Sequence, residues 1–382
     1  MPFAFTDTQI AVREMAEDFA REQIAPHALA WDEAKTLPVD VLRQAAALGM
    51  AAIYTGEELG GSGLGRMDAV LIFEALARGC PTISAFLSIH NMTTWMIDTA
   101  GSPALRAALV PKLATMELIG SYCLTEPGSG SDAAALTTRA RREDDHYIID
   151  GTKQFISGAG LSDVYVTMVR TGGEGASGIT ALVIPKDAPG ISFGASERKM
   201  GWHAQPTRMV TFDGVRVPVG NRLGEEGEGF RLAMKGLDGG RLNIAAASLG
   251  GAESALERTL AHMKERKAFG HRLEDFQALQ FRLADMATKI EASRALLYSA
   301  AEALDRGAPD ATARIAMAKR FVTDSCFEVV DDALQLHGGY GYLAEFGIEK
   351  LLRDLRVHRI LEGTNEIMRM IVARSLIKGE MQ

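Results

Sequence analysis

Val164-Tyr165-Val166-Thr167-Met168-Val169 is a run in which every side chain is β-branched, aromatic or otherwise apolar. Such a run is typical of a buried β-strand. Similar runs occur at Tyr147–Ile149, Ile179–Ile184 and Val210–Phe212. Asp150-Gly151 and Asp213-Gly214 follow two of these runs, and such dipeptides favour tight hairpins. The sequence therefore predicts a mainly antiparallel β domain over residues 120–224.

Helical periodicity replaces the strand pattern on both sides of this region. Thr6 to Gln9 form a capping box ahead of an amphipathic helix, and helical spacing continues to about residue 119. Beyond Gly229, an apolar stripe runs through Leu279, Leu283, Met286, Ile290 and Leu297. We therefore expect an α+β fold with an N-terminal helical domain at residues 1–119, the middle β domain at 120–224 and a C-terminal four-helix bundle at 225–382.

The composition restricts the classes of protein that remain possible. The chain has 382 residues, which exceeds one ordinary core, and its net charge of -8 gives no basic surface for nucleic acid. The three cysteines are far apart and the eight histidines lack metal-binding spacing, so we expect neither disulfides nor a metal site. No apolar run approaches a membrane span and the N-terminus lacks a signal-peptide pattern, so we expect a cytoplasmic protein without a membrane partner.

One carboxylate near the C-terminus lies in an unusual setting, Arg359-Ile360-Leu361-Glu362-Gly363-Thr364-Asn365-Glu366. Gly363 lets the main chain approach a ligand closely, and Thr364 is a plausible N-cap of the amphipathic run that follows. Ile360 and Leu361 are expected to desolvate Glu362 and to raise its pKa, which suits a general base near neutral pH. The alternative is an ordinary solvated surface glutamate.

Two strand ends carry small polar residues beside an aromatic side chain. Tyr122 to Asp132 lead from a strand into a loop rich in glycine and serine, and Lys153 to Gly158 place Phe155 next to a hydroxyl and a glycine. Exposed N–H groups and hydroxyls can hold a phosphate or a polar ring edge, and an aromatic side chain can pack on a flat heterocycle. The alternative is a plain turn and hairpin core.

Two other glycine patterns are rejected as functional motifs. Gly173 to Gly178 satisfy G-x-G-x-x-G, but they join two predicted strands, so no helix presents its N-terminus to a pyrophosphate. Gly190 to Gly194 satisfy G-x-S-x-G, yet Ser192 lies in strand-like alternation with no helix after it, which argues against a serine hydrolase.

Arginines and glycines mark three places in the helical C-terminal part. Gly239-Gly240-Arg241 precedes a predicted long helix, and Glu265 to Gly270 interrupt the next one. Either arginine can bind phosphate or lie on a solvated face. Gln335 to Tyr342 end a helix with three glycines, of which a helix C-cap explains only one.

Together and in this order, these segments resemble the acyl-CoA dehydrogenase family over essentially the whole chain. The resemblance implies a homotetramer with one FAD per subunit between the β domain and the bundle. It also implies an enzyme that removes the α-proton of an acyl-CoA to Glu362 while the β-hydrogen leaves as hydride to flavin N5. An electron-transferring flavoprotein is the implied electron acceptor.

The resemblance assigns roles to individual residues. Flavin-ring contacts are implied for Tyr122, Leu124, Thr125, Gly130, Ser131, Phe155, Ile156 and Ser157. Contacts to the FAD of a neighbouring subunit are implied for Arg266, Phe269, Phe276, Gln277, Gln335, Gly338 and Gly339. The stretch that closes on the cofactor is Thr364, Asn365 and Glu366. Substrate contacts are implied for Ser131, Asp238, Arg241, Leu361, Gly363 and Arg374.

Several segments resemble the branch of the family that converts isobutyryl-CoA to methacrylyl-CoA in valine breakdown, among them Ser88 to Met92 and Gly201-Trp202. Leu361 stands where straight-chain enzymes commonly carry tyrosine, and Gly240 stands where other branches carry the base. The alternatives are 2-methylbutyryl-CoA or a short straight-chain acyl-CoA as substrate, an acyl-CoA oxidase, and a non-catalytic acyl-CoA-binding subunit.

Overall fold

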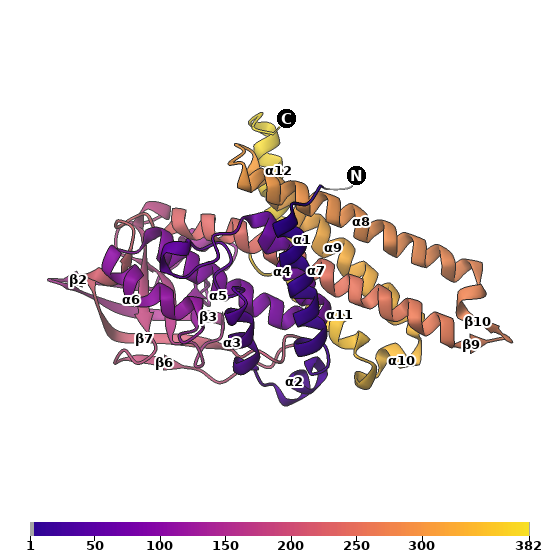
Figure 1. Cartoon of the computed structure of the whole chain (residues 1–382). Helices are drawn as coiled ribbons and strands as arrows, with labels where there is room; N and C mark the ends of the chain where they lie inside the picture. Colours follow the sequence, from indigo (N-terminus) through magenta and orange to yellow (C-terminus); the bar gives the residue numbers. More distant parts are fainter. Residues whose placement is uncertain (1–3, 382) are drawn as a thin grey trace.

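A computed structural model describes residues 4–381, and the chain begins with helices (Figure 1). The Thr6 hydroxyl accepts the N–H of Gln9 and the Gln9 side chain accepts the N–H of Thr6, which confirms the predicted capping box. Pro81 and Pro103 begin two later helices; the N–H that proline lacks makes no intrahelical hydrogen bond at this first position. The helices are α1 (Asp7–Phe19), α2 (Ala28–Ala34), α3 (Val39–Ala47), α4 (Arg66–Gly79), α5 (Pro81–Ala100) and α6 (Pro103–Ala114).

A single large sheet follows these helices. Its strands are β1 (Gly120–Cys123), β2 (Arg139–Glu143), β3 (His146–Ser157), β4 (Val164–Arg170), β5 (Ile179–Pro185), β6 (Ile191–Phe193), β7 (Thr207–Pro218) and β8 (Arg222–Leu223). The order is β6-β7-β3-β2-β4-β5-β8, and β1 pairs with β4. Only the β1–β4 and β2–β4 pairs are parallel, so the sheet is mainly antiparallel, as predicted. Residues 173–178 join β4 to β5 as the predicted hairpin loop.

The two predicted Asp-Gly hairpins are wrong. Asp150-Gly151 lies inside β3 and Asp213-Gly214 lies inside β7, and these long strands pair with each other. The register shifts between Ile149 and Gly151, and the Gly214 N–H donates to Asp150 Oδ1 at 2.8 Å. Gly151 and Gly214 have φ of 146° and 61°, so the dipeptides form a bulge between two continuous strands rather than turns that end them.

Long helices return after the sheet and extend away from it (Figure 1). They are α7 (Gly229–Glu265), α8 (Gln277–Asp305) and α9 (Ala311–His337), followed by α10 (Gly339–Tyr342), α11 (Ile348–Arg356) and α12 (Asn365–Ile377), with a small hairpin of β9 (Lys267–Ala268) and β10 (His271–Arg272) between α7 and α8. Helix α9 packs against α7, α8, α11 and α12. The order of helices, sheet and helical bundle confirms the expected α+β fold class.

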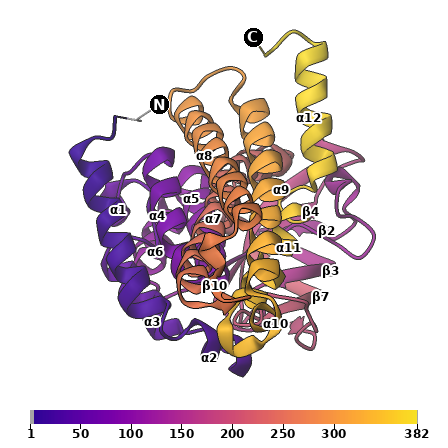
Figure 2. The ribbon, with the colours of Figure 1, turned by 90° about the vertical axis from the view of Figure 1, so that its right-hand side faces the viewer.

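Helix α7 is the central element of the molecule. It packs against α4 and α5 on one side and against α8 and α9 on the other, so the N-terminal helices and the bundle share one apolar core. In Figure 2 the N-terminal helices lie on one side of α8 and α9, and the sheet strands lie on the other. A Cβ on Gly250 would overlap the Glu74 carbonyl, so glycine lets α7 and α4 approach closely. Within residues 4–381, no helix combines the length and apolar character that crossing a bilayer requires.

Candidate active site

Glu362 lies in a tight turn between α11 and α12. Its φ is 54° and that of Gly363 is 92°, so two consecutive residues have the left-handed conformation, which is strained for a glutamate. The Thr364 hydroxyl accepts the N–H of Ile367 at 3.3 Å, which confirms Thr364 as the N-cap of α12. The turn therefore reverses the chain directly before a capped helix and turns the Glu362 side chain toward α7.

Gly240 provides the space in which this carboxylate lies. A Cβ on Gly240 would overlap Oε2 of Glu362, so only glycine at this position lets the carboxylate lie against the helix backbone. The sequence interpretation placed Gly239-Gly240-Arg241 ahead of a helix, and this is wrong because all three residues lie within α7. The contact explains the glycine at position 240 despite its cost to helix stability, and a Cβ on Gly239 would overlap the Arg66 side chain instead.

The environment of Glu362 suits a proton acceptor. Its Oε2 is buried and receives no hydrogen bond from any residue between 4 and 381. This burial raises the pKa of the Glu362 carboxyl to about 7, against the opposing effect of the Arg241 and Lys319 charges. The raised pKa was predicted, but Ile360 is 52% exposed and so contributes little to the desolvation.

Two buried cations hold the backbone of the turn. Arg241 of α7 donates from Nε to the Glu362 carbonyl at 3.0 Å and from a terminal nitrogen to Asp238 at 2.7 Å. Lys319 of α9 donates to the Gly363 carbonyl at 2.8 Å. Two consecutive carbonyls are thus bound by side chains from different helices.

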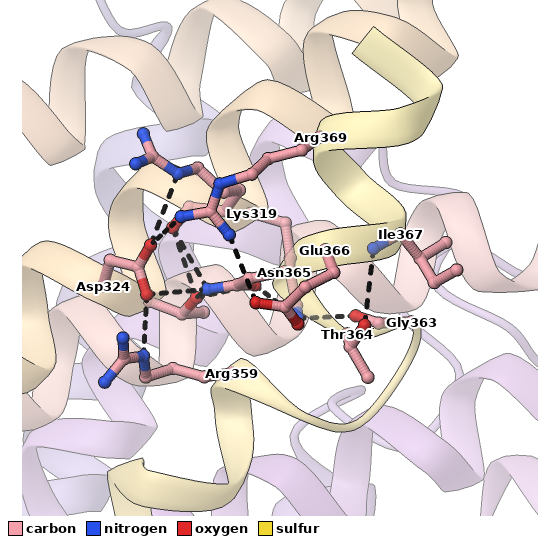
Figure 3. Close-up of polar contacts among 11 residues, drawn as sticks. Lys319, Asp324, Arg359, Gly363, Thr364, Asn365, Glu366, Ile367 and Arg369 are labelled. Atoms are coloured by element: carbon pink, nitrogen blue, oxygen red, sulfur yellow. Dashed lines mark hydrogen bonds and ion pairs between the residues drawn. The ribbon is translucent and has the colours of Figure 1, made fainter. Parts of the chain in front are cut away.

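Asn365 and Glu366, which begin α12, differ from each other in their surroundings (Figure 3). Asn365 is buried and bonds to Lys319, Thr323 and Asp324 of α9. Glu366 is exposed, and Arg369 reaches it at 3.4 Å. Among the stretch Thr364–Glu366, then, the amide anchors α12 to α9, whereas the carboxylate of Glu366 faces outward.

The structure brings the two predicted strand ends together. The Thr125 carbonyl accepts the N–H of Gln154 at 2.8 Å, and the Ser157 carbonyl accepts the Ser121 hydroxyl at 2.6 Å. Leu124 and Ile156 are buried, whereas Phe155 is 61% exposed. Gly130 and Ser131 lie in the exposed loop that follows, and a Cβ on Gly130 would meet no atom within 4 Å. The exposed members of the set, Phe155, Gly130 and Ser131, thus present open surface at the strand ends.

Tyr122 connects this surface to the carboxylate. Its hydroxyl is buried and has no hydrogen-bond partner within residues 4–381. Burial raises the pKa of the Tyr122 phenol, and the nearby Glu362 charge adds to the rise. Tyr122 of the first strand end and Glu362 of the turn thus each have a buried polar atom without a hydrogen-bond partner within residues 4–381, and they are close enough for the Glu362 charge to affect Tyr122.

A buried ion pair supports the first strand end from behind. Lys153 donates to Glu126 at 2.8 Å and to the Leu124 carbonyl at 3.0 Å. Glu126 also accepts the N–H groups of Thr137 and Thr138. Despite burial, the Lys153 charge and these hydrogen bonds lower the pKa of Glu126 to about 2, so this carboxylate stays ionised.

A cleft of about 510 Å³ lies beside α7. Asp238 and Arg241 line it, together with Phe230, Lys235 and Ile371 among others. Of the other predicted substrate residues, Leu361 and Gly363 flank the carboxylate in the chain. Arg374 is exposed and lies on α12, three positions after the lining residue Ile371.

The remaining predicted cofactor residues lie at the far end of the bundle. A pocket of about 780 Å³ is lined by Arg266, Gln335, Gly338 and Gly339, with further residues of α7 and α8. Nearby, the rings of Phe269 and Phe276 are 6.4 Å apart, and Phe269 is 93% exposed; Gln277 begins α8. Gln335 follows Lys319 by 16 positions on α9, which corresponds to about 24 Å. Within one chain, this group does not meet the turn that carries Glu362.

Known proteins identify the class to which this architecture belongs. The family model "Acyl-CoA dehydrogenase, N-terminal domain" matches residues 6–117, "Acyl-CoA dehydrogenase, middle domain" matches 121–215, and "Acyl-CoA dehydrogenase, C-terminal domain" matches 227–377. The chain belongs to the acyl-CoA dehydrogenase family, whose members are flavin-dependent oxidoreductases, and this confirms the resemblance.

Within this family, the chain is similar to several individual proteins. The chain is 54% identical over 376 residues to the mitochondrial isobutyryl-CoA dehydrogenase of Dictyostelium discoideum and 51% identical over 373 residues to that of Bos taurus. Each match covers 98% of this chain and 90% of the relative. A solved structure described as "PigA with FAD and proline" shares the fold with a TM-score of 0.95 at 31% identity, covering 98% of this chain and 99% of that one.

The residues present fit FAD, the cofactor that the family implies. The exposed Phe155 ring offers a flat face, and the unpartnered Tyr122 hydroxyl offers a polar group for a ligand to satisfy. At the far pocket, a Cβ on Gly338 or Gly339 would meet no atom within 4 Å, so the backbone there is open to a ligand. Within residues 4–381, no group of three His, Cys, Asp or Glu side chains is placed to hold a metal ion.

Sequence reasoning missed two residues of α9, Lys319 and Asp324. Lys319 lies among Ile315, Ala318 and Val322 on the buried face of the helix. A lysine at an apolar position of a helical stripe is the signal that marks it, because a buried ammonium needs specific partners. Asp324 carries no such signal, since its partners come from another segment of the chain.

Proposed function

We propose that the protein oxidises short branched-chain acyl-CoA esters at the α,β position, with isobutyryl-CoA as substrate and methacrylyl-CoA as product. The observation that carries the proposal is the Glu362 carboxylate, whose Oε2 is buried and unpartnered against Gly240, near a cleft lined by Arg241. The two relatives above 50% identity, both isobutyryl-CoA dehydrogenases, support the choice of acyl group.

Glu362 is the catalytic base in this proposal. In its ionised form, Oε2 takes the α-proton of the thioester, and the Cα–Cβ bond becomes a double bond as the β-hydrogen departs. FAD, when bound, supplies the two-electron acceptor for that hydrogen, which leaves as hydride. Within residues 4–381, no acceptor binds the Glu362 backbone N–H, so this donor is free to stabilise negative charge on the thioester oxygen.

We further propose that FAD lies across a subunit boundary in a homotetramer. Tyr122, Leu124, Thr125, Gly130, Ser131, Phe155, Ile156 and Ser157 hold the flavin end, next to Thr364 to Glu366. The pocket around Arg266 and Gln335 receives the FAD of a neighbouring subunit. The separation of about 24 Å along α9 and the 93% exposure of Phe269 support this division.

The cleft is the proposed path of the CoA thioester. Asp238 and Arg241 line it, and Ser131 and Arg374 lie in exposed positions that suit the CoA part. Leu361, next to the base, leaves room for a substituent on the α-carbon where a planar tyrosine would not. One methyl group discriminates by only roughly 1–3 kcal/mol, so 2-methylbutyryl-CoA and butyryl-CoA are the competing substrates.

An electron-transferring flavoprotein is the proposed electron acceptor, and the cytoplasm is the proposed compartment. Three cysteines that are all buried and free agree with a reducing environment. An acyl-CoA oxidase would pass electrons to oxygen instead, and it is recognised by stoichiometric hydrogen peroxide. A non-catalytic acyl-CoA-binding subunit would be isolated without a flavin absorbance.

The decisive experiment is an anaerobic titration of the purified flavoprotein with isobutyryl-CoA, 2-methylbutyryl-CoA, butyryl-CoA and octanoyl-CoA. The rate of loss of flavin absorbance is measured for each ester. We expect isobutyryl-CoA to bleach the flavin fastest. Faster bleaching by butyryl-CoA would contradict the branched-chain assignment, and no bleaching by any ester would contradict the enzymatic function.

A further inference from the structure

One carboxylate binds both flanks of the catalytic turn. Asp324 of α9 accepts a hydrogen bond from Arg359 Nε at 2.7 Å and another from Asn365 Nδ2 at 2.9 Å, both on Oδ1. Arg359 precedes Glu362 by three residues and Asn365 follows it by three. Figure 3 shows both side chains pointing to Asp324 from opposite ends of the turn. A single oxygen atom thus closes the loop that carries the proposed base.

The second oxygen of Asp324 faces two further cations. Arg320 Nε lies 3.3 Å from Oδ2 as an ion pair, and Arg369 of α12 donates to Oδ2 at 3.3 Å (Figure 3). With Arg359, three guanidinium groups therefore surround one carboxylate that is only 14% exposed. Because the carboxylate holds three positive charges close together, its loss would leave them to repel one another.

Lys319 binds the same turn from its other side. Its buried Nζ donates to the Gly363 carbonyl at 2.8 Å and to Asn365 Oδ1 at 3.0 Å. Asn365 is therefore held twice, through its oxygen by Lys319 and through its nitrogen by Asp324. Both residues come from α9, so one rigid helix fixes the turn at three points.

These contacts hold a conformation that the turn would not keep alone. Glu362 and Gly363 both have positive φ, and a glutamate in that region costs of the order of 1–3 kcal/mol unless tertiary contacts impose it. We propose that Asp324 and Lys319 are positioning residues that form a latch on α9, which keeps the 359–365 turn in place and the Glu362 carboxylate against Gly240. The latch rests on the proposed function, since it acts through the proposed base.

The two members of the latch differ in their electrostatic effect on Glu362. The groups that face this carboxylate are Arg241 from α7, Lys319 from α9, Tyr122 from β1 and Tyr54 from the segment before α4. Lys319 lowers the pKa of Glu362, whereas Asp324 contributes no comparable effect. Removal of the Lys319 charge should therefore raise the pKa of Glu362, whereas neutralisation of Asp324 should leave that pKa unchanged.

The test compares three variants of the full-length flavoprotein. Asp324→Asn removes the charge without a change in volume, and Lys319→Met removes the ammonium from a buried chain of similar length. Glu328→Gln is the matched control, because Glu328 is an exposed α9 carboxylate that pairs with Lys289 at 2.9 Å away from the turn. Hydrogen–deuterium exchange of peptides that cover residues 359–367 is measured first, without substrate. Anaerobic flavin reduction by saturating isobutyryl-CoA is then measured from pH 6 to 9.

We expect the 359–367 peptides to exchange faster than in the wild type for both latch variants, and at the wild-type rate for Glu328→Gln. Flavin reduction should slow by roughly 10- to 100-fold in both while FAD content is retained, because a small misplacement of a reacting group has that effect. The pH midpoint should rise only in Lys319→Met. If both latch variants exchange and reduce flavin at the wild-type rates, the latch is wrong. It is also wrong if their reduction rates fall only in proportion to a loss of bound FAD.

Failure of the latch and failure of the proposed function give different results. If the wild-type flavin is reduced and Asp324→Asn matches it in rate and exchange, the latch is wrong and the function stands. If no acyl-CoA reduces the wild-type flavin, the function is wrong, and the exchange comparison between Asp324→Asn and Glu328→Gln still decides whether α9 holds the turn.

Discussion

A Cβ on Gly240 would occupy the place of Glu362 Oε2. These two residues lie 122 positions apart in the sequence, and their contact places the carboxylate against the backbone of α7. Arg241 of α7 and Lys319 of α9 hold the turn that carries Glu362, and α7 admits the carboxylate because position 240 has no side chain. The position of the carboxylate thus depends on a fit between two helices and one turn.

Replacement of Gly240 by alanine should displace the Glu362 carboxylate. We expect Gly240→Ala to retain FAD but to reduce it about 100-fold more slowly with isobutyryl-CoA, measured by anaerobic stopped flow. Gly236→Ala is the control, since its Cβ would meet only the flexible Met96 and Met92 side chains at 3.2 and 3.4 Å. Equal rates for the two variants would show that the carboxylate does not need the space at position 240.

The pH dependence of flavin reduction should report the ionisation of Glu362. Burial raises the pKa of this carboxyl from its ordinary 4.5 to about 7, and only the ionised form accepts a proton. The reduction rate at saturating substrate should therefore rise through about pH 7 and level off above it. A midpoint near 4.5 or a flat profile between pH 5 and 9 would contradict the assignment of this group as the base.

The same raised pKa predicts a change in stability when Glu362 is replaced by glutamine. The folded protein favours the protonated carboxyl, so ionisation costs stability as the pH rises from about 4.5 through about 7. Glutamine does not ionise, and Glu362→Gln should be more stable than the wild type at pH 8 by on the order of 3 kcal/mol, and by much less at pH 5. Denaturant unfolding at both pH values checks this, and a difference that does not grow with pH would refute it.

The buried Lys153–Glu126 pair should control how well the flavin end of the site is held. Lys153→Met leaves a buried carboxylate without its cation, which typically costs about 3–5 kcal/mol, and removes the bond to the Leu124 carbonyl. We expect a lower melting temperature and loss of FAD during gel filtration. Lys289→Met, at an exposed ion pair, is the control. If Lys153→Met retains FAD and the wild-type melting temperature, the pair has no such role.

Much of the fold was predictable from local patterns, and the errors have physical causes. In strand runs such as Val164–Val169 and helical stripes such as Leu279–Leu297, the buried apolar residues lie close together in the sequence. The spacing of these residues therefore identified the strands and helices. Asp150-Gly151 was misread because a bulge and a hairpin need the same positive φ from glycine. Gly239-Gly240 was misread because close contacts with other segments override helix propensity.

Some residues of the candidate site were likewise predictable from local sequence, and others were not. Glu362 and its N-cap neighbour Thr364 were found because the features that mark them lie within a few residues of each other. Asp324 was missed because its role arises from contacts with residues 35 and 41 positions away. The roles proposed for Arg266 and Gln335 involve a neighbouring subunit, and the sequence indicated them only through resemblance to a family.

Removal of the α-proton by Glu362 is tested by the response of the flavin to substrate when this carboxylate is replaced. Wild-type and Glu362→Gln flavoproteins are mixed anaerobically with isobutyryl-CoA and the flavin absorbance is followed through a single turnover. We expect the variant to bind FAD and the thioester, seen as a spectral shift on mixing, yet not to bleach on the time scale of the wild type. Bleaching of Glu362→Gln at the wild-type rate would show that another group removes the proton.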